Sequence, residues 1–393
     1  MRTGDAPGTF LRACALAVAV ATGLAVATAE AGSVHRVLAA LAGPPLAALL
    51  VAAFVSHRRL LAPVAVTASL LLVTAVVPGT AHLALAIPAF ASAAVLAALT
   101  WRGAHVAAGA WRDYLTLTKP RVMTLLLLTG LCGAAVGAHG RPSPSLLAVT
   151  FVGLALACGG AAALNHVMDR DIDKLMGPRT ASRPVAAGRL TAPRALEFGL
   201  ALSAASFTLL ASEANVLTAV LALVGNLFYV VVYTGYLKRR GPENIVLGGV
   251  AGAVPPLVGY AAATGSVAVP ALWLFAIVCL WTPPHFWALA LLIREHYERA
   301  AVPMLPVVRG ESVTLRRIVW YTVVLVAATV VPVATGTFGA LYLVAALVLG
   351  GLFLALAVRL LRTPSRKGAA GLFHFSLLYL ALLFVAAALD PLL

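Results

Sequence analysis

Long apolar runs separated by short polar interruptions dominate this chain, and they predict helices that cross a membrane. A bilayer-spanning helix needs about 20 apolar residues, and the runs between charged interruptions give about thirteen candidate spans. Their approximate limits are 13–29, 37–54, 61–78, 82–100, 121–138, 145–167, 194–211, 215–236, 245–263, 270–293, 316–335, 339–360 and 371–389. The pattern therefore predicts an all-α, polytopic membrane protein.

The composition supports this class. Hydrophobic residues make up 62% of the 393 residues, charged residues make up 10%, and the mean hydropathy is +0.99. A soluble domain is about half apolar and about a quarter charged. The four cysteines fall singly within apolar runs, which indicates small core residues and favours neither a disulfide framework nor a metal cluster; they are Cys14, Cys132, Cys158 and Cys279.

The basic residues fix the predicted orientation. If the N-terminus is cytoplasmic, all 28 Lys and Arg residues lie on the cytoplasmic side except Arg36 and Arg141. Because cytoplasmic loops carry the excess of Lys and Arg, this asymmetry predicts an odd number of crossings, cytoplasmic charged loops and an external C-terminus. We expect the membrane to be the bacterial plasma membrane. The net charge of +15 then belongs to loops that face anionic lipid. It does not indicate a nucleic-acid partner.

The chain divides into two predicted blocks, residues 1–111 with about four spans and residues 112–393 with about nine. The first span also has features of a signal peptide, with a basic start, an apolar core and the sequence Ala27-Thr28-Ala29 as a cleavage-like site. We expect an uncleaved span, because further spans follow without a soluble domain.

A group of polar residues at the end of one apolar run predicts a metal site. Asn165, Asp169 and Asp173 are spaced i, i+4 and i+8, which places them on one face of a helix. The whole chain has only 13 acidic residues, and carboxylates at a membrane boundary are costly unless they are neutralised. Mg²⁺ fits, since it bridges one or two carboxylates to substrate phosphates. The alternative is a solvated helix end paired with Arg170 and Lys174.

Basic residues at the same level of the membrane predict an anion site. Arg179 and Arg183 follow the aspartates, and Lys238 and Arg239 end another span. Arg offers a planar fork for phosphate, and Lys offers a compact charge. The alternative is that they are ordinary cytoplasmic anchors, which is the interpretation we prefer for residues such as Arg240.

Motifs distributed from residue 112 to the end carry a family resemblance. This region resembles the UbiA family of membrane prenyltransferases and, within it, the branch that modifies haem. The matching segments are Leu117–Val122, Asn165–Asp173, Met176–Pro184, Tyr233–Arg239, Asn244–Pro256, Trp281–Trp287 and Pro303–Pro306. The resemblance implies a bundle of about nine transmembrane helices, here preceded by about four extra helices.

The resemblance also implies a reaction and roles for residues. It implies a transferase that uses Mg²⁺ to move a farnesyl group from farnesyl diphosphate to a vinyl group of haem b, which gives haem O for terminal oxidases. Haem A synthase or cytochrome oxidase assembly factors are the implied protein partners. The implied metal ligands are Asn165, Asp169 and Asp173, the further catalytic residues are Arg179, Arg183 and Lys238, and the substrate-binding residues are Arg239, Trp281, His285, Glu295 and Tyr297.

Two other functions stay open on the sequence. One is a UbiA-type prenyltransferase that acts on a phenolic or quinone acceptor, and the other is a membrane haem carrier without chemistry. His285 follows Pro283 and Pro284 and lies between Trp281 and Trp287, a setting that suits a flat macrocycle. A structural histidine at a proline kink is the alternative.

The second acidic element departs from the family pattern, as does the spacing before Arg179. Two residues rather than one separate Met176 from Arg179, and His296 stands where an aspartate is expected. Glu295 is then the main carboxylate for a second metal, with Glu298 as a substitute, so the sequence leaves one or two Mg²⁺ ions open.

The first block resembles, more weakly, one four-helix half of haem A synthase. His35 and His82 begin two of its spans, and two facing histidines in a bundle are able to ligate haem. The alternative, which we prefer, is a degenerate or unrelated membrane anchor.

Overall fold

The computed structural model describes residues 111–392, and every regular element in this part of the chain is helical. Nine of its helices are long and apolar enough to cross a membrane, as predicted. The four spans predicted between residues 13 and 100 lie outside the described residues. The nine are α7 (Pro120–Gly137), α8 (Pro144–Met168), α11 (Ala192–Glu213), the span Val216–Arg239 that begins with α12 (Val216–Leu227), α13 (Asn244–Thr264), α14 (Val269–Leu292), α17 (Gly310–Ala334), α18 (Ala340–Arg362) and α19 (Arg366–Leu389).

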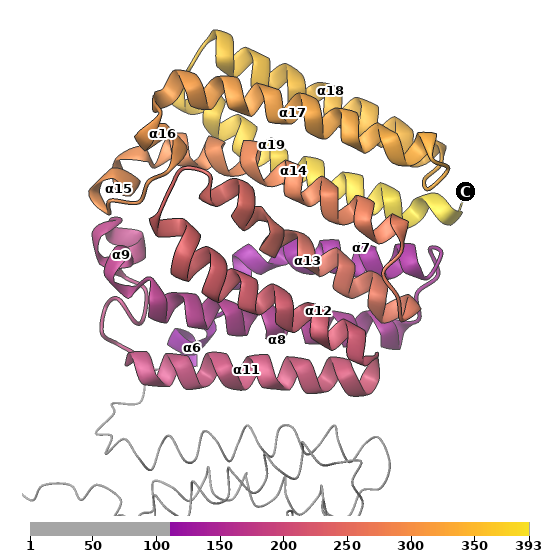
Figure 1. Cartoon of the computed structure of the whole chain (residues 1–393), viewed down its shortest axis with the longest axis horizontal. Coiled ribbons are helices and arrows are strands. Elements are labelled where there is room, and N and C mark those ends of the chain that lie inside the picture. Colours follow the sequence, from indigo (N-terminus) through magenta and orange to yellow (C-terminus); the bar gives the residue numbers. More distant parts are fainter. Residues whose placement is uncertain (1–110, 393) are drawn as a thin grey trace, which may run out of the picture.

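The long helices lie side by side in one bundle (Figure 1). α8 packs on α11, α7 on α13, α13 on α14, and α17 and α19 flank α18. The main core lies where α14, α17, α18 and α19 meet, and its largest fully buried side chains are Trp287, Tyr342, Phe353, Tyr379 and Phe384.

Glycines allow α7 and α13 to approach very closely. A Cβ atom on Gly259 would overlap the backbone oxygen of Gly130, and one on Gly133 would overlap the backbone oxygen of Pro256. Small residues at such crossings let two backbones meet in a membrane, where packing replaces the hydrophobic effect as the main attraction. Two other glycines of α13 differ in their surroundings: Gly249 is packed against Thr282, whereas Gly252 faces open space.

Short helices gather at one end of the bundle, opposite the C-terminus. Figure 1 places α9 (Arg170–Leu175), α15 (Arg294–Arg299) and α16 (Leu305–Val308) together at this end. An apolar cluster that includes Ile172 and Tyr297 joins them to the ends of the long helices. This is the end that the charge pattern predicts to be cytoplasmic.

One span changes its helix type before it reaches this end. After α12 the chain continues as a π-helix, η2 (Phe228–Tyr236), and then as a 3₁₀ turn, η3 (Leu237–Arg239). A π-helix bonds each N–H to the carbonyl five residues earlier, and such segments are frequent at functional sites. The sequence pattern gave no indication of this change.

Candidate active site

The acidic motif lies at a junction between two helices. The sequence predicted one continuous helix through Asp173, but α8 ends at Met168, Asp169 is the residue between, and α9 begins at Arg170. Two helical backbone hydrogen bonds continue across the junction. The Asp169 N–H donates to the Asn165 carbonyl at 2.9 Å, and the Asp173 N–H donates to the Asp169 carbonyl at 2.8 Å. The predicted one-turn spacing is therefore kept.

Both carboxylates are buried, and each is only half satisfied. Asp169 and Asp173 are each 1% exposed. Lys238 Nζ lies 2.5 Å from Asp169 Oδ2, and Arg183 Nη1 lies 2.6 Å from Asp173 Oδ1. The other oxygens, Asp169 Oδ1 and Asp173 Oδ2, are buried without a hydrogen-bond partner. A buried charged oxygen without a partner is costly, so a further cation at this point would be stabilising.

Asn165 connects this pair to two other elements. Its Nδ2 donates to Asp169 Oδ2 at 2.8 Å and to Thr234 Oγ1, in η2, at 3.0 Å. Its Oδ1 accepts from Lys119 Nζ at 2.5 Å. Lys119, just before α7, is a site residue that the sequence reasoning missed, although it stands in the Thr-Lys-Pro motif that carried the resemblance.

Positive charge exceeds negative charge in this cluster. Burial and the neighbouring Arg183 lower the pKa of Lys119 to about 7. Burial raises the pKa of Asp173, even though the hydrogen bond from Arg183 acts in the opposite direction. The crowded cations would be relieved by an anion, and the unsatisfied carboxylate oxygens would be relieved by a metal ion. The site therefore suits a metal–anion pair better than either ion alone.

The donor set fits Mg²⁺ bound together with a phosphate ligand. The two free carboxylate oxygens are hard donors of the kind that Mg²⁺ takes. Among residues 111–392 there is no group of three or more His, Cys, Asp or Glu side chains that could hold a metal by themselves. Mg²⁺ usually completes its shell with water and substrate phosphates, so two carboxylates suffice.

Several predicted site residues lie at the rim of this network. Arg239 makes a bidentate pair with the exposed Asp171, at 2.7 and 2.8 Å, and also donates to the Met168 carbonyl. Arg179 is exposed in the short helix α10 (Pro178–Ala181). Glu295 has a side chain that is 89% exposed. The structure does not bring these three groups to the free carboxylate oxygens.

The α15 segment meets the acidic junction through two other residues. Tyr297 is buried, and burial raises the pKa of its hydroxyl. The His296 ring lies next to Gly177, which has a φ of 116° and would hold a Cβ atom only about 3.1 Å from that ring. His296 thus packs against the chain that follows α9, in the position where the family pattern has an acid.

His285 belongs to a separate cluster on α14 and α19. Its ring is stacked between Trp281, at a centroid distance of 4.2 Å, and Phe373, at 4.8 Å. His285 Nδ1 lies 2.6 Å from Ser376 Oγ, and Trp281 Nε1 donates to the Ser376 carbonyl at 2.8 Å. Both faces of the imidazole are covered, so only its Nε2 edge is available to a ligand.

The network around Ser376 fixes the tautomer of His285. The Ser376 hydroxyl donates its single proton to the Phe373 carbonyl at 2.6 Å. It must therefore accept from His285, which assigns the proton to Nδ1 and leaves a lone pair on Nε2. Metal-binding histidines are commonly held in this way through the nitrogen that does not bind the metal.

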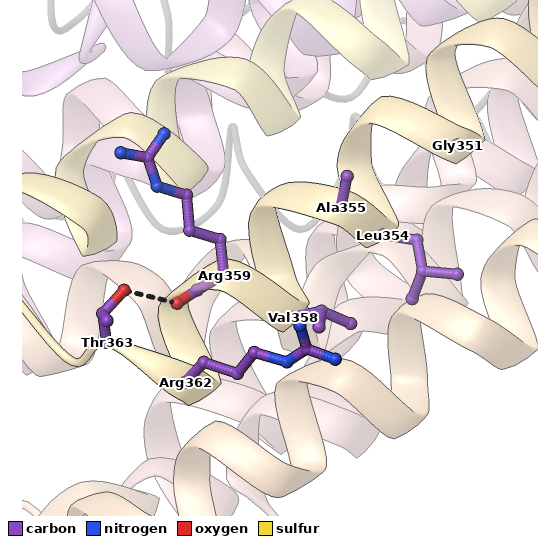
Figure 2. A pocket seen from close by; sticks show the side chains of 7 residues that line it. All are labelled: Gly351, Leu354, Ala355, Val358, Arg359, Arg362 and Thr363. Atoms are coloured by element: carbon purple, nitrogen blue, oxygen red, sulfur yellow. Dashed lines mark hydrogen bonds between the residues drawn. The ribbon is translucent and has the colours of Figure 1, made fainter.

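A surface hollow on α18 contains none of these residues. It has a volume of about 610 Å³, and Figure 2 shows that its lining comes from one helix, with apolar side chains beside Arg359 and Arg362. Since it shares no lining residue with the acidic junction, it is not the candidate active site.

Comparisons with known proteins agree with this picture. The model of the UbiA prenyltransferase family matches residues 126–385. A protoheme IX farnesyltransferase of Symbiobacterium thermophilum is 52% identical over 281 residues, which are 71% of this chain and 94% of the relative. One from Thermus thermophilus is 49% identical over 280 residues, but these are only 46% of its length, so the chain spans about half of that relative.

Two solved structures share the fold. A digeranylgeranylglyceryl phosphate synthase aligns with a TM-score of 0.60 and 20% identity, over 72% of this chain and 98% of the other. A UbiA homologue from Aeropyrum pernix K1 aligns with a TM-score of 0.56 and 20% identity, over 68% and 98% respectively. At this identity the likeness establishes the helical fold alone.

Proposed function

Because the chain belongs to the UbiA prenyltransferase family and is a prenyltransferase, we propose that it transfers a farnesyl group from farnesyl diphosphate to a vinyl group of haem b. The product is haem O. The identity of 52% with a protoheme IX farnesyltransferase, over 94% of that protein, supports the choice of acceptor. The acidic junction supports the choice of a diphosphate donor.

One observation carries the proposal: two buried carboxylates each keep one free oxygen while cations surround them. Arg183 pairs with Asp173 and Lys238 pairs with Asp169, while Lys119 brings a third positive group to Asn165 beside them. Buried ion pairs contribute little to stability, since the cost of removing two charges from water offsets most of their attraction. Such a cluster at a membrane boundary is better explained by a ligand that carries both signs of charge.

The proposed chemistry divides between the metal and the protein. Mg²⁺, held by Asp169 and Asp173, supplies charge neutralisation for the leaving diphosphate when it is bound. Lys119, Lys238 and Arg183 bind the diphosphate oxygens and stabilise the negative charge that grows as the allylic C–O bond breaks. The diphosphate leaves with the bonding electrons, and the vinyl group supplies the pair for the new C–C bond. This leaves a cation on the vinyl carbon next to the porphyrin ring, and water adds to that carbon with loss of a proton, which gives the hydroxyl group of the product. Asn165 acts as an orienting group.

We propose that His285 binds the haem that accepts the farnesyl group. Its Nε2 edge carries a lone pair, while Trp281, Phe373 and Ser376 hold the ring in place. This arrangement is suited to ligating the haem iron or to accepting a hydrogen bond from haem, and it leaves no face for stacking on the porphyrin. Trp281 then supports His285 and does not itself stack on the macrocycle.

The proposed location is the bacterial plasma membrane. The acidic junction lies at the end of the bundle where α9, α15 and α16 gather (Figure 1), which is the predicted cytoplasmic side. A water-soluble metal ion and a diphosphate headgroup reach that side directly, while the prenyl chain remains in the apolar region.

A reconstituted reaction tests the proposal. Purified full-length protein is incubated with haem b, farnesyl diphosphate and Mg²⁺, and haem O is sought by mass spectrometry, with EDTA as the metal-free control. Haem O that forms only with Mg²⁺ supports the proposal. Prenylation of 4-hydroxybenzoate in place of haem would establish the aromatic-acceptor function, and tight haem binding without any product would establish a haem carrier.

A further inference from the structure

Thr234 is a buried residue of the π-helix η2 that contacts the acidic junction from a different span. Its side chain is 0% exposed. Its Oγ1 donates to the Tyr229 carbonyl, five residues earlier, at 2.9 Å. In a regular α-helix a threonine bonds the carbonyl three or four residues earlier, as Thr329 does with Val326 and Thr322 with Ile318 in α17. The π-helix thus gives Thr234 a different hydrogen-bond partner and turns its hydroxyl toward α8.

The hydroxyl of Thr234 helps to orient the side-chain amide of Asn165, together with Lys119 and Asp169. A hydroxyl has one proton, and this one is donated to Tyr229, so Thr234 Oγ1 must accept from Asn165 at 3.0 Å. The group of Asn165 that faces it is therefore the Nδ2 amide. The second Nδ2 proton goes to Asp169 Oδ2 at 2.8 Å, and Oδ1 faces Lys119. Both possible amide orientations were open on the sequence, and this network allows one.

The fixed amide in turn orients the carboxylate of Asp169. Its Oδ2 is held by Asn165 and by Lys238, which leaves Oδ1 free. We propose that Thr234 is a positioning residue that acts through Asn165 to aim the free oxygen of Asp169 at the metal ion. This inference rests on the proposed function, and it assigns Asn165 an orienting role in place of a metal-ligand role.

Matched substitutions test the role of the hydroxyl. Thr234→Val removes the hydroxyl and keeps the β-branched shape, whereas Thr234→Ser keeps the hydroxyl. Groups that orient metal ligands are worth about 10- to 100-fold in metal affinity or activity, so Thr234→Val is expected to weaken metal binding by at least about tenfold. Thr234→Ser is expected to keep most of it. Thr322→Val removes an equally buried hydroxyl in α17 and is expected to have no effect.

The primary readout is metal binding and does not depend on turnover. Mn²⁺ binding to the full-length protein, with inorganic pyrophosphate present, is measured by electron paramagnetic resonance, and haem O formation is measured in parallel. If the proposal is right, Thr234→Val has no further effect once Asn165→Ala is present, because the two residues act in series. Additive losses, or equal losses in Thr234→Val and Thr322→Val, would overturn it.

Different results would contradict the positioning role of Thr234 and the proposed prenyl transfer to haem. If the wild-type protein forms haem O and Thr234→Val binds Mn²⁺ as the wild type does, the role of Thr234 is wrong and the proposed function stands. If the wild type binds Mn²⁺ with pyrophosphate but prenylates no haem, the proposed acceptor is wrong and the positioning role is still decided by the binding series. A wild type that binds no Mn²⁺ overturns both.

Discussion

At the scale of single residues, the burial of Asp169 and Asp173 determines the electrostatic properties of the site. Each is 1% exposed, and each shares only one oxygen with a cation. Burying two ion pairs seldom increases stability, whereas removing one partner of a buried pair is strongly destabilising. The cluster is therefore expensive without a ligand and sensitive to substitution, which makes conservative changes the most informative ones.

Asp169→Asn tests the metal ligand without changing its shape. The amide cannot supply a charged oxygen to Mg²⁺, so haem O formation is expected to fall by at least about 100-fold, the usual cost of losing one preorganised electrostatic contact. Asp171→Asn is the control, since Asp171 belongs to the same motif but is exposed and paired with Arg239. It is expected to retain near-normal turnover. Comparable losses in both variants would contradict the assignment.

Lys119→Met tests the cation that the sequence reasoning did not identify. Methionine keeps an unbranched side chain, one atom shorter, and removes the charge. The KM for farnesyl diphosphate is therefore expected to rise by about tenfold or more, as for other hydrogen bonds to charged groups. Arg121→Met removes a nearby exposed basic residue and is expected to leave the KM unchanged. Steady-state kinetics with varied farnesyl diphosphate distinguishes the two. An equal KM in all three proteins would exclude Lys119 from the diphosphate site.

The sequence predicted five of the seven residues that the structure joins in this network. Asp169, Asp173 and Asn165 follow from their one-turn spacing. Arg183 and Lys238 follow from their level in the membrane together with the family motifs in which they stand. The hydrogen bonds Lys119–Asn165 and Thr234–Asn165 join residues that are 46 and 69 positions apart in the sequence. No local periodicity encodes such contacts, and the π-helix that directs Thr234 arises from packing.

At the scale of elements, the close packing of α7 on α13 supports the neighbouring span Val216–Arg239, whose last residues lie at the site. Lys119 precedes α7, and η3 is followed by α13, so a shift between these helices would change the position of Lys119 relative to Lys238. The apolar pattern located both helices within a few residues. It did not predict how closely they cross, because the glycines involved were only some of those in the two runs.

Gly259→Ala tests this crossing. The added methyl group would overlap the backbone oxygen of Gly130, and overpacking of this kind costs about 1–3 kcal/mol. The melting temperature in detergent is therefore expected to fall. Gly252→Ala, on the same helix, adds a methyl group to open space and is expected to be neutral or slightly stabilising. Equal melting temperatures for the two variants would show that the crossing is looser than described.

At the scale of the whole molecule, the charge asymmetry of the loops and the number of spans predict the same arrangement of the two ends of the bundle. Nine spans in residues 111–392 place the acidic junction and the C-terminus at opposite ends of the bundle (Figure 1). The sequence predicted this number because hydropathy is summed over many residues, and single errors do not change it. Which end of the bundle faces the cytoplasm remains a prediction from the loop charge. The division at residue 111 and the role of the first block remain predictions.

Cysteine labelling tests the polarity directly. In a variant whose native cysteines are replaced by serine, Lys174→Cys and Arg141→Cys introduce thiols at exposed positions on opposite ends. A membrane-impermeant maleimide is expected to label Arg141→Cys in intact cells and Lys174→Cys only after permeabilisation. The reverse pattern would place the acidic junction outside the cell and contradict the proposed access for farnesyl diphosphate.

The central claim is that Asp169 and Asp173 capture a divalent metal ion together with diphosphate. It is tested most directly by an experimental structure with Mn²⁺ and farnesyl thiodiphosphate, an unreactive analogue, in which anomalous scattering locates the metal. We expect Mn²⁺ between the free carboxylate oxygens and the diphosphate, with Lys119, Lys238 and Arg183 on the phosphate oxygens. Carboxylates paired only with Lys238 and Arg183, with metal and analogue bound elsewhere, would contradict the account.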